Sequence, residues 1–98
     1  MATLTDIGTF ITQTPGICGG RPRIAGTGVS VRRVVGWYEM GLTPEEITIE
    51  IPHLDLAQVH AAISYYHANR DEMEAAMAAE EAEADRLEQE HRESRRNR

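Results

Sequence analysis

The sequence contains no lysine, one cysteine and no long apolar run, and each shortage excludes a class of protein. Without lysine, the chain cannot form the phosphate loop of nucleotide-binding proteins, which needs a lysine after its glycines. The single cysteine, Cys18, allows neither an internal disulfide nor a cysteine-based zinc cluster. No apolar stretch reaches the roughly 20 residues that cross a bilayer, and the N-terminus lacks a signal-peptide pattern. We therefore expect a cytoplasmic protein without membrane contacts.

The charged residues are segregated along the chain, although the net charge is only -6. Residues 21–33 contain four arginines and no acid, whereas residues 71–90 contain nine acids and one arginine. The last eight residues contain four arginines and one acid. This order of basic, acidic and basic segments suggests contacts with different partners.

Five glycines, Cys18 and two arginines are concentrated in the stretch GICGGRPRIAGTGVSV, residues 16–31. No histidine lies near Cys18 in the sequence, so a buried structural thiol is expected rather than a redox or nucleophilic centre. The glycines are typical of tight turns and close backbone packing. Residues 23–25 are a short extended candidate, and Pro22 restricts it to a sheet edge or to the start of a strand.

Capping residues predict two short helices after this stretch. Ser30 is a good N-cap, and the apolar positions 31, 34, 35 and 38 then fall on one helical face. Gly41 can take the left-handed conformation that ends the first helix. The second helix has Thr43 as its cap and Glu46 three residues later, which is a capping box, and Pro52 stops it after about residue 50.

A third and much longer helix is predicted from residue 56 to about residue 90. Asp55 and Gln58 form a second capping box, and neither glycine nor proline interrupts the residues that follow. A single apolar stripe runs along this helix, with eight apolar residues among ten positions from 56 to 87. The stripe weakens after Tyr66, where alanine and glutamate dominate. We interpret this second half as a projecting helix that needs a binding partner for stability.

These elements together predict a mainly α protein. Its core is a small helix-turn-helix-like unit of three helices, preceded by a short N-terminal β element and followed by a long C-terminal helix. Residues 1–69 form the domain, and residues 70–98 form a projecting acidic helix and an arginine-rich tail. A chain of 98 residues buries a limited core, so a second subunit is a natural source of stability.

Five segments have a familiar order and spacing: ICGGRPRIAGT (17–27), VSV (29–31), GLTPEEI (41–47), PHL (52–54) and VHAAISYY (59–66). They resemble the bacterial domain-of-unknown-function 433 family over residues 14 to 68. This chain has Gly28 where the family usually has an arginine. The resemblance implies a compact, helix-turn-helix-related and dimeric domain. It further implies an antitoxin of a type II toxin–antitoxin pair, encoded beside a PIN-like nuclease toxin and autoregulating its operon.

Two sets of residues are candidates for binding operator DNA and the toxin. An arginine patch could bind the phosphates of operator DNA, and a dimer would double it; its members are Arg21, Arg23, Arg32 and Arg33. The acidic helix and its arginine end suit a segment that lies along the toxin and places arginines among its metal-binding carboxylates. Its candidate residues are Met73, Met77, Leu87, Arg92, Arg95, Arg96 and Arg98.

Two other interpretations remain open. The chain could be a stand-alone dimeric DNA-binding transcriptional regulator, or residues 70–98 could be a solvated tail without a partner. In helix-turn-helix proteins the helix after the turn enters the major groove. Its early exposed positions are expected at Asp55, Ala57, Gln58, His60 and Ala61, of which Gln58 alone is a strong base reader.

No enzyme activity, catalytic residue, metal or cofactor is expected. His53, His60 and His67 recur every seven residues, but two helical turns separate the last two by about 10 Å, which is too far to share an ion. The compact region also lacks a nucleophile with a neighbouring base.

Overall fold

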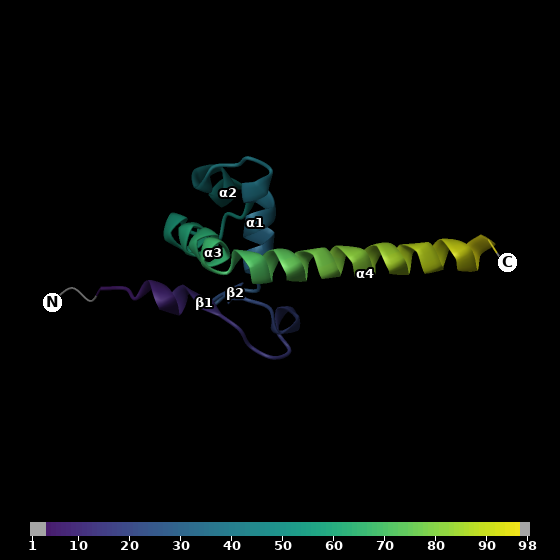
Figure 1. Ribbon diagram of the computed structural model, residues 1–98. Helices are drawn as coiled ribbons and strands as arrows, with labels where there is room; N and C mark the ends of the chain where they lie inside the picture. The colour runs from purple at the N-terminus through teal and green to yellow at the C-terminus, as the bar shows by residue number, and fades with distance from the viewer. Residues whose placement is uncertain (1–3, 97–98) are drawn as a thin grey trace.

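The computed structural model describes residues 4–96 of the chain. Two 3-10 helices, η1 (Ile7–Phe10) and η2 (Cys18–Gly20), alternate with two strands, β1 (Ile11–Thr12) and β2 (Arg23–Ile24). Four α-helices follow: α1 (Val31–Glu39), α2 (Pro44–Glu50), α3 (Leu56–Ala68) and α4 (Arg70–Arg96). Helices α1 to α3 pack together, and α4 leaves them as a long rod (Figure 1). The predicted mainly α fold, with a short N-terminal β element and a long C-terminal helix, is confirmed.

The N-terminal β element is a two-stranded antiparallel sheet. Ile11 pairs with Ile24, and Thr12 pairs with Arg23. Pro22 lies immediately before β2, as predicted, because proline has no N–H to donate within a ladder. Ile24 is fully buried, and the sheet packs against α1 and α3. This packing joins the glycine-rich stretch to the helical core.

Side-chain caps determine where the first three α-helices begin. The Ser30 hydroxyl accepts a hydrogen bond from the backbone three residues later. Thr43 and Glu46 form one predicted capping box, and Asp55 and Gln58 form the other. The Thr43 backbone N–H donates to the Glu46 carboxylate and lowers the pKa of Glu46. The predicted helix starts are confirmed, because these caps satisfy N–H groups that the first turn leaves unpaired.

Helix α1 ends at Glu39, and Gly41 follows two residues later as the predicted left-handed stop. Gly41 has a φ of +95°, in the left-handed region that favours glycine. Its N–H donates to the Tyr38 carbonyl (3.0 Å), and the Leu42 N–H donates to the Trp37 carbonyl (3.3 Å). These bonds use carbonyls that the helix end leaves free, and they turn the chain toward α2.

The hydrophobic core lies between β2 and the four α-helices. Its fully buried members come from β2, α1, α2 and α3, and they are Ile24, Val31, Val34, Val35, Ile47, Val59 and Ala62. Helix α4 contributes Met73 to the same cluster. The core therefore extends beyond the three helices that were expected to contain it.

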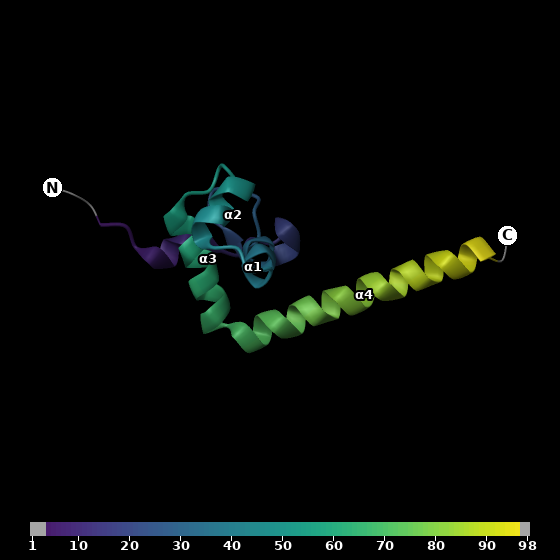
Figure 2. The same cartoon turned by 90° about the horizontal axis from the view of Figure 1, so that it is seen from above.

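The prediction of one continuous helix from residue 56 to about residue 90 is wrong. Helix α3 ends at Ala68, and α4 begins at Arg70 in a new direction (Figure 2). Between them Asn69 has φ -128° and ψ 34°, outside the α-helical region. Its side-chain amide donates a hydrogen bond to the Tyr65 carbonyl (3.0 Å), near the end of α3. Asparagine makes such local bonds readily, so the bend needs neither glycine nor proline.

The bend brings the first part of α4 back onto the domain. Met73 is only 8% exposed, and Met77 is half-buried against the same core. A straight continuation of α3 would carry both side chains away from that core, so their burial favours the bend. The apolar stripe predicted along one helix is therefore interrupted, and Leu56 and Leu87 near its two ends are exposed.

Candidate functional site

Beyond Glu80, α4 extends away from the rest of the protein (Figure 1). Every residue from 81 to 96, which we call the distal segment, is exposed. Helix α4 has 27 residues and is therefore about 40 Å long. The longest dimension of the protein is 69 Å, against 29 and 25 Å for the other two. The distal segment thus offers its whole circumference to a partner.

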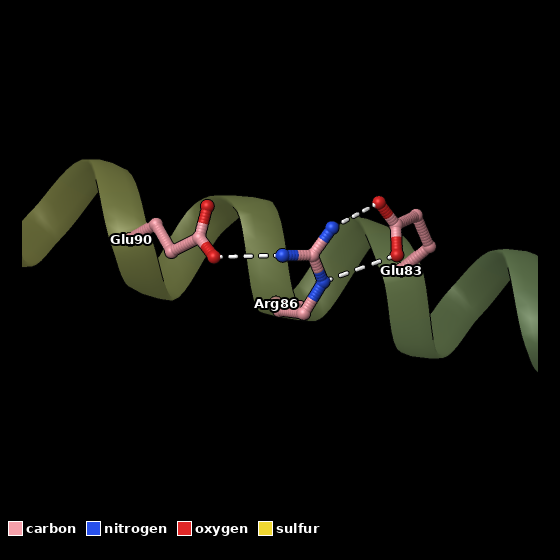
Figure 3. A network of polar contacts seen from close by, with 3 residues as sticks. All are labelled: Glu83, Arg86 and Glu90. Carbon is pink, nitrogen blue, oxygen red and sulfur yellow. Dashed lines mark hydrogen bonds and ion pairs between the residues drawn. The ribbon is translucent and has the colours of Figure 1, made fainter.

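Ion pairs on its own surface support the helical conformation of the distal segment. Arg86 contacts Glu83 through two nitrogens (2.5 and 3.1 Å) and Glu90 through the third (2.7 Å), as Figure 3 shows. Hydrogen bonding to Glu83 raises the pKa of Arg86. Side chains three and four residues apart are neighbours on a helix, so these pairs form without any contribution from the domain.

The arginines predicted to bind the toxin lie at the end of the distal segment. Arg92 pairs with Glu88 (2.6 Å). Arg95 and Arg96 are exposed, and neither forms an ion pair with another residue between 4 and 96. Arg98 lies outside the described residues. The structure therefore leaves Arg95 and Arg96 available, whereas Arg92 already has an internal partner.

The three apolar candidates for toxin binding have different surroundings. Leu87 is 52% exposed on the distal segment, so it can contact another protein. Met77 is half-buried against the core. Met73 is covered by the core of the chain itself, so its side chain is not exposed on the surface of the protein. The predicted projecting part of α4 is accordingly shorter than residues 70–98, since contact with the domain continues to Glu80.

Glu80 joins α4 to two of the four arginines predicted to bind DNA. One Glu80 carboxylate oxygen lies 2.5 Å from Arg21 Nε, and the other lies 2.6 Å from Arg32 Nη1. The Glu80 side chain is only 22% exposed. We call these three residues the Glu80 cluster. It contains two positive charges and one negative charge, so the carboxylate neutralises only part of the arginine pair.

A pocket of about 220 Å³ lies beside the Glu80 cluster. Residues from the N-terminal segment, α1, α3 and α4 line it, including Gln13, Tyr65, Asn69 and Met77. Pockets that enclose drug-sized ligands usually measure about 300–1,000 Å³. The size therefore gives no support for a small-molecule site, and the charges of the cluster are the more informative feature.

The other two candidate arginines differ from each other. Arg23 is half-buried, and its guanidinium donates to the Thr27 carbonyl (2.9 Å) and the Thr14 hydroxyl (3.1 Å). These bonds hold Arg23 between two loops of its own chain, so this candidate for phosphate binding is engaged internally. Arg33 is exposed on α1 and makes no ion pair within the described part of the chain.

Helix α3 offers few groups that could read DNA bases. The side-chain oxygen of Gln58 accepts a hydrogen bond from the Asp55 N–H (2.8 Å), so it is engaged in the capping box. Ala61 was expected on the exposed face and is instead buried in the domain. His60 is exposed. A major-groove helix needs several free donors and acceptors near its start, and α3 lacks such a set.

A polar contact also crosses the bend between α3 and α4. The Tyr66 hydroxyl donates to Glu74 Oε1 (2.8 Å), and Arg70 Nε donates to the same oxygen (3.2 Å). The bond to Glu74 raises the pKa of Tyr66 to about 12. The bonds from Tyr66 and Arg70 lower the pKa of Glu74. This contact ties the end of α3 to the first turns of α4.

The side chains of Cys18 and His67 have hydrogen-bond partners within the protein. The Cys18 thiol donates to the Gly28 carbonyl (3.2 Å), and His67 is hydrogen-bonded to the Tyr38 hydroxyl (3.1 Å). Among residues 4–96, no three His, Cys, Asp or Glu side chains come together in a way that could hold a metal ion. Within the same range, no helix combines the length and the apolar character needed to span a membrane.

Glu80 is not among the contact residues predicted from the sequence. Glu80 is one of the two non-apolar positions of the predicted stripe, yet it follows Met73 by seven residues and Met77 by three, on one face of α4. A charged residue on a face that otherwise packs against the core needs oppositely charged partners. That signal, combined with the acid-free arginine segment at 21–33, could have predicted the cluster.

Comparisons with known proteins agree on one family. The family described as "Protein of unknown function (DUF433)" matches residues 11–66. The crystal structure of a DUF433 member protein from Anabaena variabilis ATCC 29413 is similar, with a TM-score of 0.65 and 31% sequence identity, over 71% of this chain and 69% of that chain. Among curated proteins, none matches the chain. The family match includes β1 and most of α3, and it ends before α4.

Proposed function

The chain belongs to the DUF433 family, and from this premise we propose that it is the antitoxin-like component of a type II toxin–antitoxin pair. In this role it binds and neutralises a PIN-like nuclease toxin in the cytoplasm and has no enzyme activity of its own. The observation that carries the proposal is the distal segment, an exposed acidic helix with arginines at its end. Because this segment lies beyond the family match, it is an element through which one member can select its own partner.

The end of the distal segment supplies the inhibitory chemistry in this proposal. A PIN-like nuclease holds its divalent metal with carboxylates, and arginine pairs with carboxylates through charge-assisted hydrogen bonds. Arg95 and Arg96 are exposed and ready for such pairs. Arg92 would exchange Glu88 for a toxin carboxylate at small cost, because exposed ion pairs contribute little stability. Leu87 gives the same segment an apolar contact.

The proposal also includes a homodimer whose domain contacts operator DNA. A role as a stand-alone DNA-binding regulator has weaker support than the antitoxin role. Arg21 and Arg32 are engaged with Glu80, and Arg23 is held by Thr14 and Thr27. Helix α3 adds few base-reading groups. The protein-binding role therefore remains the better match to the exposed chemistry of the chain.

Co-expression with the product of the adjacent gene tests the proposal. We expect that product to arrest growth when expressed alone and to be neutralised by the full-length chain. A chain that ends at Glu81 keeps Met73, Met77 and the Glu80 cluster but lacks most of the distal segment, and it should fail to neutralise. The double variant Arg95→Ala/Arg96→Ala should weaken neutralisation and complex formation in a pull-down.

Arg33→Ala is the matched control, because it removes an exposed arginine from α1 and leaves α4 unchanged. It should neutralise as well as the original chain. A neighbouring product that is harmless alone would refute the antitoxin role. Full neutralisation by the chain that ends at Glu81 would refute the assignment of toxin binding to the distal segment.

A further inference from the structure

We infer that Arg21 and Arg32 form an anion-binding pair whose external ligand is the phosphate backbone of double-stranded DNA, and that Glu80 is its internal, competing occupant. The inference deepens the operator-binding part of the proposed function and does not depend on the toxin. Removing the Glu80 charge therefore uncovers a DNA-contacting site that the folded chain otherwise neutralises.

The first argument is the geometry of the Glu80 cluster. Arg21 lies before β2 and Arg32 lies in the first turn of α1, yet both reach the same carboxylate, at 2.5 and 2.6 Å. Each arginine contacts a different carboxylate oxygen. Phosphate, like carboxylate, presents several oxygens from one centre, and guanidinium groups suit both. The arrangement that holds Glu80 is thus one that can hold a phosphate group.

The second argument is that Glu80 does not use the full capacity of the arginines. The Arg21 and Arg32 side chains are 52% and 45% exposed, whereas that of Glu80 is 22% exposed. A guanidinium has five N–H donors, and each arginine is paired with Glu80 through one nitrogen. The pair has an open side toward solvent, through which an external anion can approach, and Glu72 lines the same pocket as the pair.

The third argument concerns the kind of anion. Arg33 follows Arg32 on α1, is exposed, and lines the same surface depression as Ser30, Arg32 and Met77. No acid lies among residues 21–33. Positive charge therefore continues from the cluster along the start of α1. A single phosphate would use only the arginine pair, whereas a duplex backbone with many phosphates can contact the pair and Arg33 together.

The position of Glu80 in the fold explains why it competes well with DNA for Arg21 and Arg32. Glu80 is the last residue of α4 that is not exposed, and Met73 and Met77 hold the preceding turns against the core. The carboxylate is thus placed by apolar packing as well as by its own charge. DNA must compete with an occupant that is already positioned, and the acidic residues of the distal segment repel it further.

A DNA-binding measurement on the full-length chain tests this inference. The probe is a labelled duplex of arbitrary sequence, because phosphate contacts carry no sequence information. Affinity is measured by fluorescence anisotropy over a series of salt concentrations for the original chain, Glu80→Gln and Glu81→Gln. Glu81→Gln is the matched control, since it makes the same change of charge one residue later, at an exposed position of α4.

We expect Glu80→Gln to bind more tightly at low salt. Its plot of log affinity against log salt should steepen by about 1.8 for each bound chain, because each additional arginine–phosphate contact contributes about 0.9. Glu81→Gln should resemble the original chain. Adding Arg21→Ala and Arg32→Ala to Glu80→Gln should restore the original slope. Excess inorganic phosphate should compete only weakly, because it can occupy the pair but not Arg33.

Equal slopes for Glu80→Gln and Glu81→Gln would overturn the inference, and so would a steep slope that persists without the two arginines. Strong competition by inorganic phosphate would overturn the assignment of DNA as the ligand. Circular dichroism and thermal melting show whether each variant is folded, and Glu80→Ala is a second variant with high helix propensity. Neutralisation of the toxin is not measured here, so failure of the antitoxin role would leave these results unchanged.

Discussion

The Tyr66 hydroxyl on α3 donates a 2.8 Å hydrogen bond to the Glu74 carboxylate on α4, across the one residue that separates the two helices. Arg70 donates to the same carboxylate oxygen, and its guanidinium lies 6.0 Å from the centre of the Tyr66 ring. Together with burial of Met73 and the ion pairs of Glu80, this contact determines the direction in which α4 leaves the domain.

Tyr66 should ionise at a higher pH than an unperturbed tyrosine. Its pKa is about 12 because its proton is held by the anionic Glu74, compared with 10.0 for an unperturbed tyrosine. A raised pKa in the folded state gives stability that is complete below pH 10 and decreases as the pH rises from 10 toward 12. Tyrosinate absorbance during a pH titration should show this late step.

Two variants test whether the late step in tyrosinate absorbance belongs to Tyr66. Tyr66→Phe should abolish the late step, and Glu74→Gln should move it back toward the ordinary tyrosine range. Tyr65→Phe is the control, since Tyr65 lies next in the chain and should leave the late step in place. Persistence of the late step in Tyr66→Phe would show that another tyrosine is responsible.

Met73 should contribute to stability as a core residue, although it belongs to α4. Met73→Ala removes a buried side chain and should lower the free energy of unfolding by about 2–5 kcal/mol. Leu87→Ala is the matched change at an exposed position of the same helix, and its effect should stay within about 0.5 kcal/mol. Urea denaturation measures both. Similar effects for the two variants would contradict the packing of α4 against the domain.

Two glycines around α1 should respond to alanine in opposite directions. Gly36 lies inside α1, and no atom would lie within 4 Å of an added Cβ, so Gly36→Ala should stabilise the protein by about 0.5–1 kcal/mol. Gly41 has a positive φ of 95°, so Gly41→Ala should destabilise it by about 1–2 kcal/mol. Thermal melting followed by circular dichroism decides the outcome. A destabilised Gly36→Ala variant would indicate that this face of α1 is packed.

Truncation should locate the end of the stable unit. A chain that ends at Glu81 should melt close to the temperature of the full chain, because the residues beyond it are all exposed. A chain that ends at Asn69 loses Met73 and Glu80 and should melt at a clearly lower temperature. Equal melting temperatures for the two truncated chains would show that the first turns of α4 contribute nothing to the domain.

Local signals in the sequence were sufficient to predict most of the fold. The caps at Ser30, Thr43 and Asp55, and the glycine at 41, act through bonds between residues only a few positions apart. Such bonds are largely independent of the rest of the protein, so the starts of α1, α2 and α3 were predicted correctly. Pro22 marked the start of β2 for the same reason, since proline restricts the backbone wherever it occurs.

The candidate site was predicted less completely, because its important contacts are distant in sequence. The arginines were noted as a group, but Glu80 pairs with only two of them, and it is 59 residues from Arg21 and 48 from Arg32. Helical periodicity placed Met73 on an apolar face without saying what that face covers. Only the folded chain shows that it covers the core of the same molecule.

By itself, the sequence determined the helical class, the capped starts of α1 to α3 and the acidic, arginine-tipped character of the C-terminal helix. These follow from local backbone preferences and side-chain chemistry. The tertiary structure alone decided that the long helix is broken at Asn69 and that Met73 and Met77 pack against the core. It also decided that Glu80 forms ion pairs with Arg21 and Arg32. The physical reason is that burial of apolar surface and pairing of distant charges depend on where separate segments meet, and local propensity does not encode that meeting point.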